Sequence, residues 1–310
     1  MSVSRKGGSY VIWTVAGVIV LAATIIGLSN QQADADISTP PVVSPNKPVV
    51  KPRLDVVFTI DATGSMGDEI EVVKKEIWTI ANTLMEGKPR PDIRFGLVFY
   101  QDRGDEFLVR KTDLTRNVDA VHEQLMAVRA GGGGDWQEHV GRGLHEALDM
   151  AWDTQQGVKR LIYLVGDAPS HDDYQDGYSL ASAIDKAKAK KITIHTIGCS
   201  GLNSGRSEFE MLAARTNGLY KTLTYEAIVT DDSGVKRSVI YYDGDMYEAE
   251  GVLDKAEWGR GGDELIKKGR LKRARPATKA KAAAAPTRNN LDDVVTDSVK
   301  EAAEDMGVAY

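Results

Sequence analysis

The stretch from Leu54 to Met66 places oxygen-bearing side chains directly after an apolar run. Asp61, Thr63 and Ser65 stand at alternate positions, so a loop that curls off the end of a strand can turn all three toward one point. A carboxylate and two hydroxyls are hard oxygen donors, which suit Mg²⁺, Ca²⁺ or Mn²⁺. Capping of the following helix by Asp61 or Thr63 is the alternative interpretation of the same residues.

Two later motifs have the residue types that would complete such a site. A glycine run at 131–134 is followed by Asp135 and Glu138, and an apolar run at 161–165 is followed by Asp167. Converging carboxylates repel one another in an empty site, and a bound cation relieves that repulsion. The three motifs together therefore indicate a cation site more strongly than any one of them.

The first motif, Asp-Ala-Thr-Gly-Ser at 61–65, resembles the metal-ion-dependent adhesion site (MIDAS) of von Willebrand factor type A domains, which usually reads Asp-x-Ser-x-Ser. Thr63 keeps the hydroxyl of the first Ser. In that family a Gly-rich loop supplies a further ligand, generally Thr, where this sequence has Asp135, and an acid after a later strand matches Asp167. The resemblance covers roughly residues 53–224. The ligands that it implies are Asp61, Thr63, Ser65, Asp135 and Asp167.

The resemblance also implies a cofactor and a partner. The expected cofactor is a divalent cation, Mg²⁺ in preference to Ca²⁺ or Mn²⁺, and an acidic residue of another protein completes its open position. Thr63, Asp135 and Asp167 take the more distant or water-mediated positions. Asp135 in place of Thr makes the site more anionic, which favours the cation but disfavours a partner carboxylate. Glu138 is the alternative ligand; otherwise it is an acid in the first turn of a helix.

Apolar runs of strand length alternate with helix-period segments through the region that resembles this family. This alternation predicts an α/β fold, a doubly wound and mostly parallel sheet covered on both faces, with one antiparallel edge strand after a short polar turn. In such sheets ligands collect at the carboxyl ends of the strands, where Asp61 and Asp167 fall. The expected strands are 54–60, 93–100, 106–111, 160–165, 191–197 and 218–223, and the expected helices are 68–85, 118–128, 137–152, 178–190 and 208–216.

The amino-terminal part of the chain predicts a membrane anchor. Residues 10–28 carry no charge, and as a helix rising about 1.5 Å per residue they match the roughly 30 Å of a bilayer core. Lys and Arg precede this segment and Asp follows it, so residues 1–9 are expected in the cytoplasm and everything after the helix outside it. Cleavage near Ala33-Asp34-Ala35, which would give a secreted protein, is the alternative.

The segments outside the von Willebrand A region have distinct compositions. Residues 29–52 form a Pro-rich, extended linker, and residues 225–250 predict a small β appendage around Asp-Ser-Gly and Asp-Gly turns. Residues 251–288 are basic and of low complexity, so we expect a solvated linker there; binding of an anionic polymer or lipid is the alternative. Residues 289–310 predict an amphipathic helix that docks on the domain or on a partner.

Composition narrows the function further. The chain has 310 residues, 42% of them hydrophobic, and its net charge of −6 argues against general nucleic-acid binding. Cys199 is the single cysteine, so an intramolecular disulfide is excluded. The sequence lacks a Gly-x-Ser-x-Gly elbow, a His-Glu-x-x-His motif and a nucleotide-binding Gly-Lys-Ser/Thr loop.

These observations favour a non-catalytic, membrane-anchored module that binds a protein through its cation and faces the periplasm or the cell surface. One alternative is a metal-dependent hydrolase built from Asp61, Asp167 and His171, or a chelatase-type enzyme component. Another is a structural module in which the cation only stabilises the loop.

Overall fold

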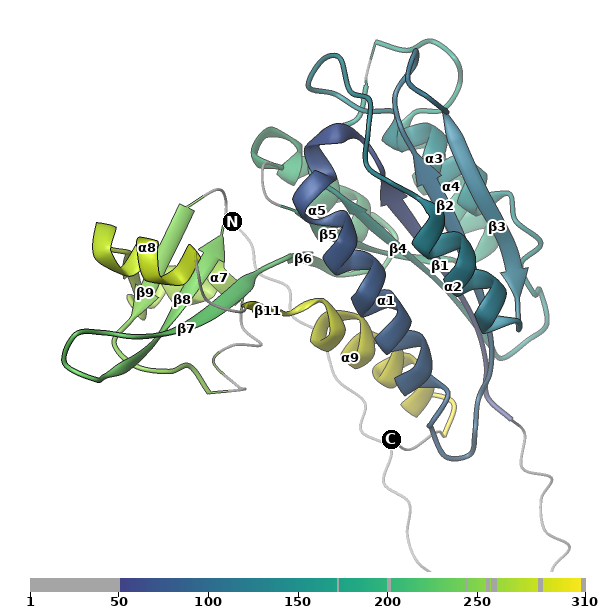
Figure 1. Ribbon diagram of the computed structural model, residues 1–310. Helices are drawn as coiled ribbons and strands as arrows, with labels where there is room; N and C mark the ends of the chain where they lie inside the picture. Colours follow the sequence, from purple (N-terminus) through teal and green to yellow (C-terminus); the bar gives the residue numbers. More distant parts are fainter. Residues whose placement is uncertain are drawn as a thin grey trace, which may run out of the picture. The chain divides into compact units, whose positions relative to one another are not determined.

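A computed structural model of the protein describes residues 51–171, 173–199, 202–242, 245–254, 257, 261–283 and 287–307 (Figure 1). The predicted membrane helix at 10–28 and nearly all of the predicted linker at 29–52 lie outside these residues. Within the described part, no helix combines the length and the apolar character needed to cross a bilayer.

The larger of two sheets has six strands in the order β3-β2-β1-β4-β5-β6. All neighbouring pairs are parallel except β2 with β3, so the prediction of a mostly parallel sheet with one antiparallel edge strand is confirmed. The strands are β1 (Arg53–Asp61), β2 (Asp92–Tyr100), β3 (Val109–Thr115), β4 (Val158–Gly166), β5 (Thr193–Gly198) and β6 (Tyr220–Thr222).

Helices cover both faces of this sheet, as Figure 1 shows. Alternate residues of a strand point to opposite faces, so Val56 and Phe58 pack into the apolar core under one helical layer and Val57 into the core under the other. One layer contains α1 (Ile70–Leu84) and α2 (Val118–Ala127); the other contains α3 (Val140–Leu148), α4 (Leu180–Lys190) and α5 (Arg206–Arg215). Two short 3₁₀ turns, Gly64–Asp68 and Asn203–Gly205, precede α1 and α5.

A second, antiparallel sheet has the order β10-β9-β8-β7-β11. It contains β7 (Tyr225–Thr230), β8 (Lys236–Tyr242), β9 (Asp245–Ala249), β10 (Leu271–Arg273) and β11 (Thr287–Asn289), with helices α7 (Gly261–Lys267) and α8 (Pro276–Ala283). The strands predicted within 225–250 are present. The prediction of an irregular linker over 251–288 is wrong, because β10 and β11 add to this sheet.

Charge pairing and small buried residues explain why the basic segment is ordered. Leu271, Ala274 and Ala282 are buried, so the segment contributes to the apolar interior of the appendage. Its cations pair with acids on β9 and on the loops that adjoin the sheet. The pairs are Lys272–Glu250, Arg275–Glu248, Lys279–Asp245 and Lys281–Asp232, with N to O distances of 2.7–3.1 Å.

The last helix, α9 (Leu291–Glu304), returns to the larger sheet and confirms the predicted amphipathic helix. Val295 and Val299 are fully buried in the same apolar cluster as Val73 and Ile77 of α1. The Ser298 hydroxyl lies 2.6 Å from the Tyr163 hydroxyl of β4. The second sheet is therefore inserted in sequence between β6 and the helix that completes one layer of the domain.

Candidate metal centre

The glycine loop at 131–134 meets the loops that follow β1 and β2, at the carboxyl ends of these strands. The amide of Ala62, just after β1, donates to the carbonyl of Tyr100 at the end of β2 (2.9 Å), and the amide of Gly131 donates to the carbonyl of Ala62 (3.0 Å). Gln101 is fully buried, and its side-chain amide donates to the carbonyls of Ala62 (2.9 Å) and Gly131 (2.6 Å). These bonds fix the glycine loop beside the loop that carries Asp61.

Four of the five predicted ligands form one connected cluster in this place. Asp61 Oδ1 accepts from the amide (2.8 Å) and the hydroxyl (2.6 Å) of Thr63. The Thr63 hydroxyl lies 3.2 Å from the Ser65 hydroxyl, which donates to Asp167 Oδ1 at 3.0 Å. Thr63 makes no side-chain capping bond to the 3₁₀ turn that follows it, so the capping interpretation does not account for this residue.

The chemistry of the cluster fits a hard divalent cation. Asp61 Oδ2 is buried and makes no hydrogen bond within the described residues, and neither Asp61 nor Asp167 has an ion-pair partner there. The buried Tyr100 hydroxyl lies near enough to Asp61 to lower the pKa of its carboxyl, but this effect is smaller than that of burial. Burial, and next the charge of Asp167, raise the pKa of Asp61 to about 7. Burial also raises the pKa of Asp167 to about 6. Ser65 is exposed, so the cluster of otherwise buried oxygens opens to solvent on its side.

The structure does not bring Asp135, the fifth predicted ligand, into this cluster. Its side chain is 59% exposed, and its Oδ1 lies 3.6 Å from Nε2 of His171. Gly132 and Gly133 both have positive φ, and the amide of Gly133 donates to both carboxylate oxygens of Asp105 (2.9 and 3.0 Å). The glycine run therefore turns toward the loop after β2 before it reaches Asp135.

Glu138, the alternative ligand from the same loop, is buried. Its amide donates to the carbonyl of Pro169 (2.9 Å), which ties the start of α3 to the loop after β4. Burial, and then the charges of Asp61 and Asp102, raise the pKa of Glu138 to about 9. Its Oε2 makes no hydrogen bond within the described residues. Glu138 thus lies within the electrostatic reach of the cluster, and one of its carboxyl oxygens is unsatisfied within the described residues.

The loop after β2 also helps to build this edge of the sheet, through Gln101, Asp102 and Asp105. These three residues were not predicted as site residues. Their position directly after a buried strand was the available signal, the same one that identified Asp61 and Asp167. His171, one of the three residues considered for a hydrolase, lies near Asp102, Asp135 and Asp173. Within the described residues it makes no hydrogen bond or ion pair with the Asp61 cluster.

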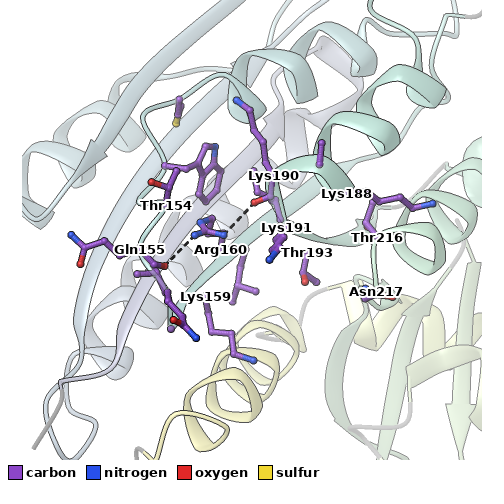
Figure 2. A pocket seen from close by; sticks show the side chains of 18 of the residues that line it. Thr154, Gln155, Lys159, Arg160, Lys188, Lys190, Lys191, Thr193, Thr216 and Asn217 are labelled. Carbon is purple, nitrogen blue, oxygen red and sulfur yellow. Dashed lines mark hydrogen bonds between the residues drawn. The ribbon is translucent and has the colours of Figure 1, made fainter.

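A broad hollow elsewhere on the domain contains an arginine with a structural role. It lies at the opposite, amino ends of β4 and β5, and Figure 2 shows Arg160 within it. The guanidinium donates to the carbonyls of Gln155 (3.4 Å) and Lys190 (3.2 Å), and so ties the loop before β4 to the end of α4. None of the predicted ligands lines this hollow.

Comparison with known protein families agrees with the fold. A sequence model described as the von Willebrand factor A domain matches residues 55–228. A curated relative, the alpha-protein kinase vwkA of Dictyostelium discoideum, is 30% identical over 124 residues, which are 38% of this chain. The match spans 19% of that protein's length.

Two solved structures are among those that resemble the chain. The pilus adhesin SpaC of Lactobacillus rhamnosus GG is 13% identical, with 66% of this chain and 38% of that one covered and a TM-score of 0.43. Proximal thread matrix protein 1 of the mussel byssus, in a form with a zinc-occupied MIDAS motif, is 19% identical, with 56% and 42% covered and a TM-score of 0.44. Because the family match spans more than half of the 310 residues, the chain belongs to the von Willebrand factor A domain family.

Proposed function

We propose that this protein is a membrane-anchored von Willebrand A module that binds a protein partner through a divalent cation held by Asp61, Thr63, Ser65 and Asp167. The observation that carries the proposal is the Asp61 carboxylate: Thr63 donates to Oδ1, while Oδ2 is buried and makes no hydrogen bond within the described residues. A buried anionic oxygen of this kind is costly unless a cation compensates it. The all-oxygen donor set favours Mg²⁺, with Ca²⁺ or Mn²⁺ as alternatives.

In this proposal Glu138, and not Asp135, supplies the ligand from the glycine loop. Its unsatisfied carboxyl oxygen and its electrostatic coupling to Asp61 support that choice. A cation bound at the cluster would offer an open position to a carboxylate oxygen of another protein. The hydroxyls of Thr63 and Ser65 link the two carboxylates, and the Thr63 hydroxyl holds Asp61 in place.

The surface beside the cluster supports a protein as the partner. Trp136, on the loop next to Asp135, is 46% exposed, and its indole nitrogen donates to the Ser204 hydroxyl (2.8 Å). An exposed indole that is held in place by a hydrogen bond offers rigid apolar contact area, as the aromatic anchors of protein interfaces do. We therefore expect Trp136 to contribute to the interface without touching the cation.

Binding assays with the full chain test this function. Wild-type protein and two variants, Asp61→Asn and Asp113→Asn, are used as baits for extracts of the source cells, in Mg²⁺ and in EDTA. Asp113 is an exposed carboxylate on β3, so it is a control for loss of one negative charge. We expect one protein to be captured by wild type and Asp113→Asn in Mg²⁺, and to be lost in EDTA and with Asp61→Asn. Capture that is equal in all arms would overturn the proposal.

The anchor is a separate part of the proposal and rests on the composition of residues 10–28. We expect the full chain to sediment with membranes, to resist extraction by alkaline carbonate, and to expose its folded domain to protease added from outside the cytoplasm. A soluble extracytoplasmic protein that begins near residue 36 would favour the cleaved form instead. Recovery of the protein in the cytosol would contradict both forms.

A further inference from the structure

Three metal-ligating side chains come together beside the Asp61 cluster and are not part of it. One ligand atom from each of Asp102, Asp135 and His171 lies within 4.8 Å of the other two. Nε2 of His171 is 3.4 Å from Asp102 Oδ2 and 3.6 Å from Asp135 Oδ1. Both separations are longer than a charge-assisted hydrogen bond, so the three groups face one another without bonding.

The loops that carry these residues are fixed by backbone contacts. The amide of His171 donates to the carbonyl of Glu138 (3.2 Å), which joins the loop after β4 to the loop that carries Asp135. Asp105 joins the β2 loop to the same region, because its carboxylate accepts from the amides of Asp102 (3.1 Å) and Gly133. The three side chains therefore converge from loops that are tied together.

His171 is held in one orientation with one ring nitrogen unused. Its side chain is 4% exposed, and Nδ1 lies 2.7 Å from Asp173 Oδ1. The ring stacks on Tyr174 at 3.9 Å, and the Tyr174 hydroxyl donates to Asp102 Oδ2 (2.8 Å). Nε2 is buried and makes no hydrogen bond within the described residues. A carboxylate that accepts from one ring nitrogen and leaves the other facing acidic oxygens is the usual support of a metal-ligating histidine.

We propose that Asp102, Asp135 and His171 form a second cation site, which takes a transition metal of the zinc class. One imidazole nitrogen with two carboxylate oxygens is a borderline donor set that suits Zn²⁺, Fe²⁺ or Ni²⁺ better than Mg²⁺. The exposed Asp135 leaves the site accessible from solvent. The site shares no ligand with the Asp61 cluster, so its metal binding can be tested separately from the proposed partner binding.

Zinc binding by the full chain, measured by equilibrium dialysis in excess Mg²⁺, tests this site. We expect one Zn²⁺ per chain in wild type and in Asp61→Asn. His171→Gln and the exposed variant Asp135→Asn should each weaken zinc binding at least tenfold, and Asp173→Asn, which only orients the ring, about tenfold. His122→Gln on α2 is the matched control and should bind zinc as wild type does.

Three results would overturn the second site. The first is the absence of zinc binding in wild type, which would leave a plain histidine and carboxylate cluster. The second is zinc binding that stays unchanged in His171→Gln and Asp135→Asn. The third is zinc binding that Asp61→Asn alone removes, which would place the ion at the Asp61 cluster. Circular dichroism of each variant shows whether its fold is retained. Because Asp135 is exposed, its variant keeps the test decisive even if His171→Gln unfolds.

Discussion

At the scale of single residues, Asp61 couples metal binding to pH. The pKa of its carboxyl is about 7 in the folded domain, raised by burial and by Asp167 from an ordinary value of 3.8. Below pH 3.8 the group is protonated in both folded and unfolded chains. As the pH rises from 3.8 through 7, the unfolded chain loses this proton first, so the metal-free fold loses stability over that window. Asp167, with a pKa of about 6, acts in the same direction.

Replacing Asp61 by Asn should therefore stabilise the metal-free domain at pH 8 by about 1–3 kcal/mol, because the buried charge is removed and the shape is kept. The variant should also lose less stability than wild type between pH 4 and pH 8, and Mg²⁺ should no longer stabilise it. Urea unfolding in EDTA and in Mg²⁺ across this range measures all three effects, with Asp113→Asn as control. The same pH dependence in Asp61→Asn and wild type would show that Asp61 is not the titrating group.

Glu138 and Asp135 provide the second test at this scale. With a pKa of about 9, Glu138 is mostly protonated in the metal-free domain at pH 7, so Glu138→Gln should change its stability by less than about 0.5 kcal/mol. If Glu138 ligates Mg²⁺, the same change should weaken Mg²⁺ binding at least tenfold, whereas Asp135→Asn should weaken it less than threefold. Calorimetric titration with Mg²⁺ separates the two, and the reverse order would restore Asp135 as the ligand.

The sequence predicted Asp61, Thr63, Ser65 and Asp167 together because residues that directly follow parallel strands are brought to one edge by the topology of the sheet. It could not choose between Asp135 and Glu138. Both follow the glycine run, and the choice depends on the path of that loop. The bonds of Gln101 and Asp105 decide that path, and these are long-range contacts that no local pattern records.

At the scale of elements, the glycine loop depends on close approach to the loop after β2. Gly132 has a φ of +79°, and a Cβ built on it would lie 2.3 Å from Cγ of Asp105. Gly132→Ala should therefore cost about 1–3 kcal/mol and weaken Mg²⁺ binding, since Asp105 must give up its bonds to the loop. Gly134 has no neighbour within 4 Å of such a Cβ and no positive φ, so Gly134→Ala is the matched control. Thermal unfolding with and without Mg²⁺ measures both; equal effects of the two variants would contradict this explanation.

Elements with strong periodicity were predicted well, and the exceptions have a common cause. The edge strand was expected at 106–111, but β3 spans Val109–Thr115. It begins later because the residues before it form a longer loop, which hydrogen bonds of Gln101 and Asp105 hold in place. Residues 251–288 were expected to form a solvated linker because they are basic and of low complexity. Its partners are acids on β9 and on the loops beside the sheet, which a window of neighbouring residues does not contain.

At the scale of the whole molecule, the von Willebrand A domain is completed by a helix that the chain reaches only after building a second sheet. Asn289 of β11 donates to Glu76 of α1 (3.2 Å), and Asn290 accepts from the amide of Thr224 (2.8 Å), so the return to the domain is fixed at both ends of the inserted segment. The predicted boundary at residue 224 therefore leaves out the helix that covers α1.

This arrangement makes the carboxyl-terminal helix part of the domain's stability. Val295 of α9 is fully buried among apolar residues of α1, so Val295→Ala should lower the free energy of unfolding by about 2 kcal/mol, from lost apolar burial and the cavity that remains. Asp297→Ala, on the exposed side of the same helix, should change it by less than about 0.5 kcal/mol. Urea unfolding followed by far-ultraviolet circular dichroism should show a single transition that moves to lower urea in Val295→Ala. If the valine variant instead unfolds as wild type does, α9 does not contribute to the stability of the domain in solution.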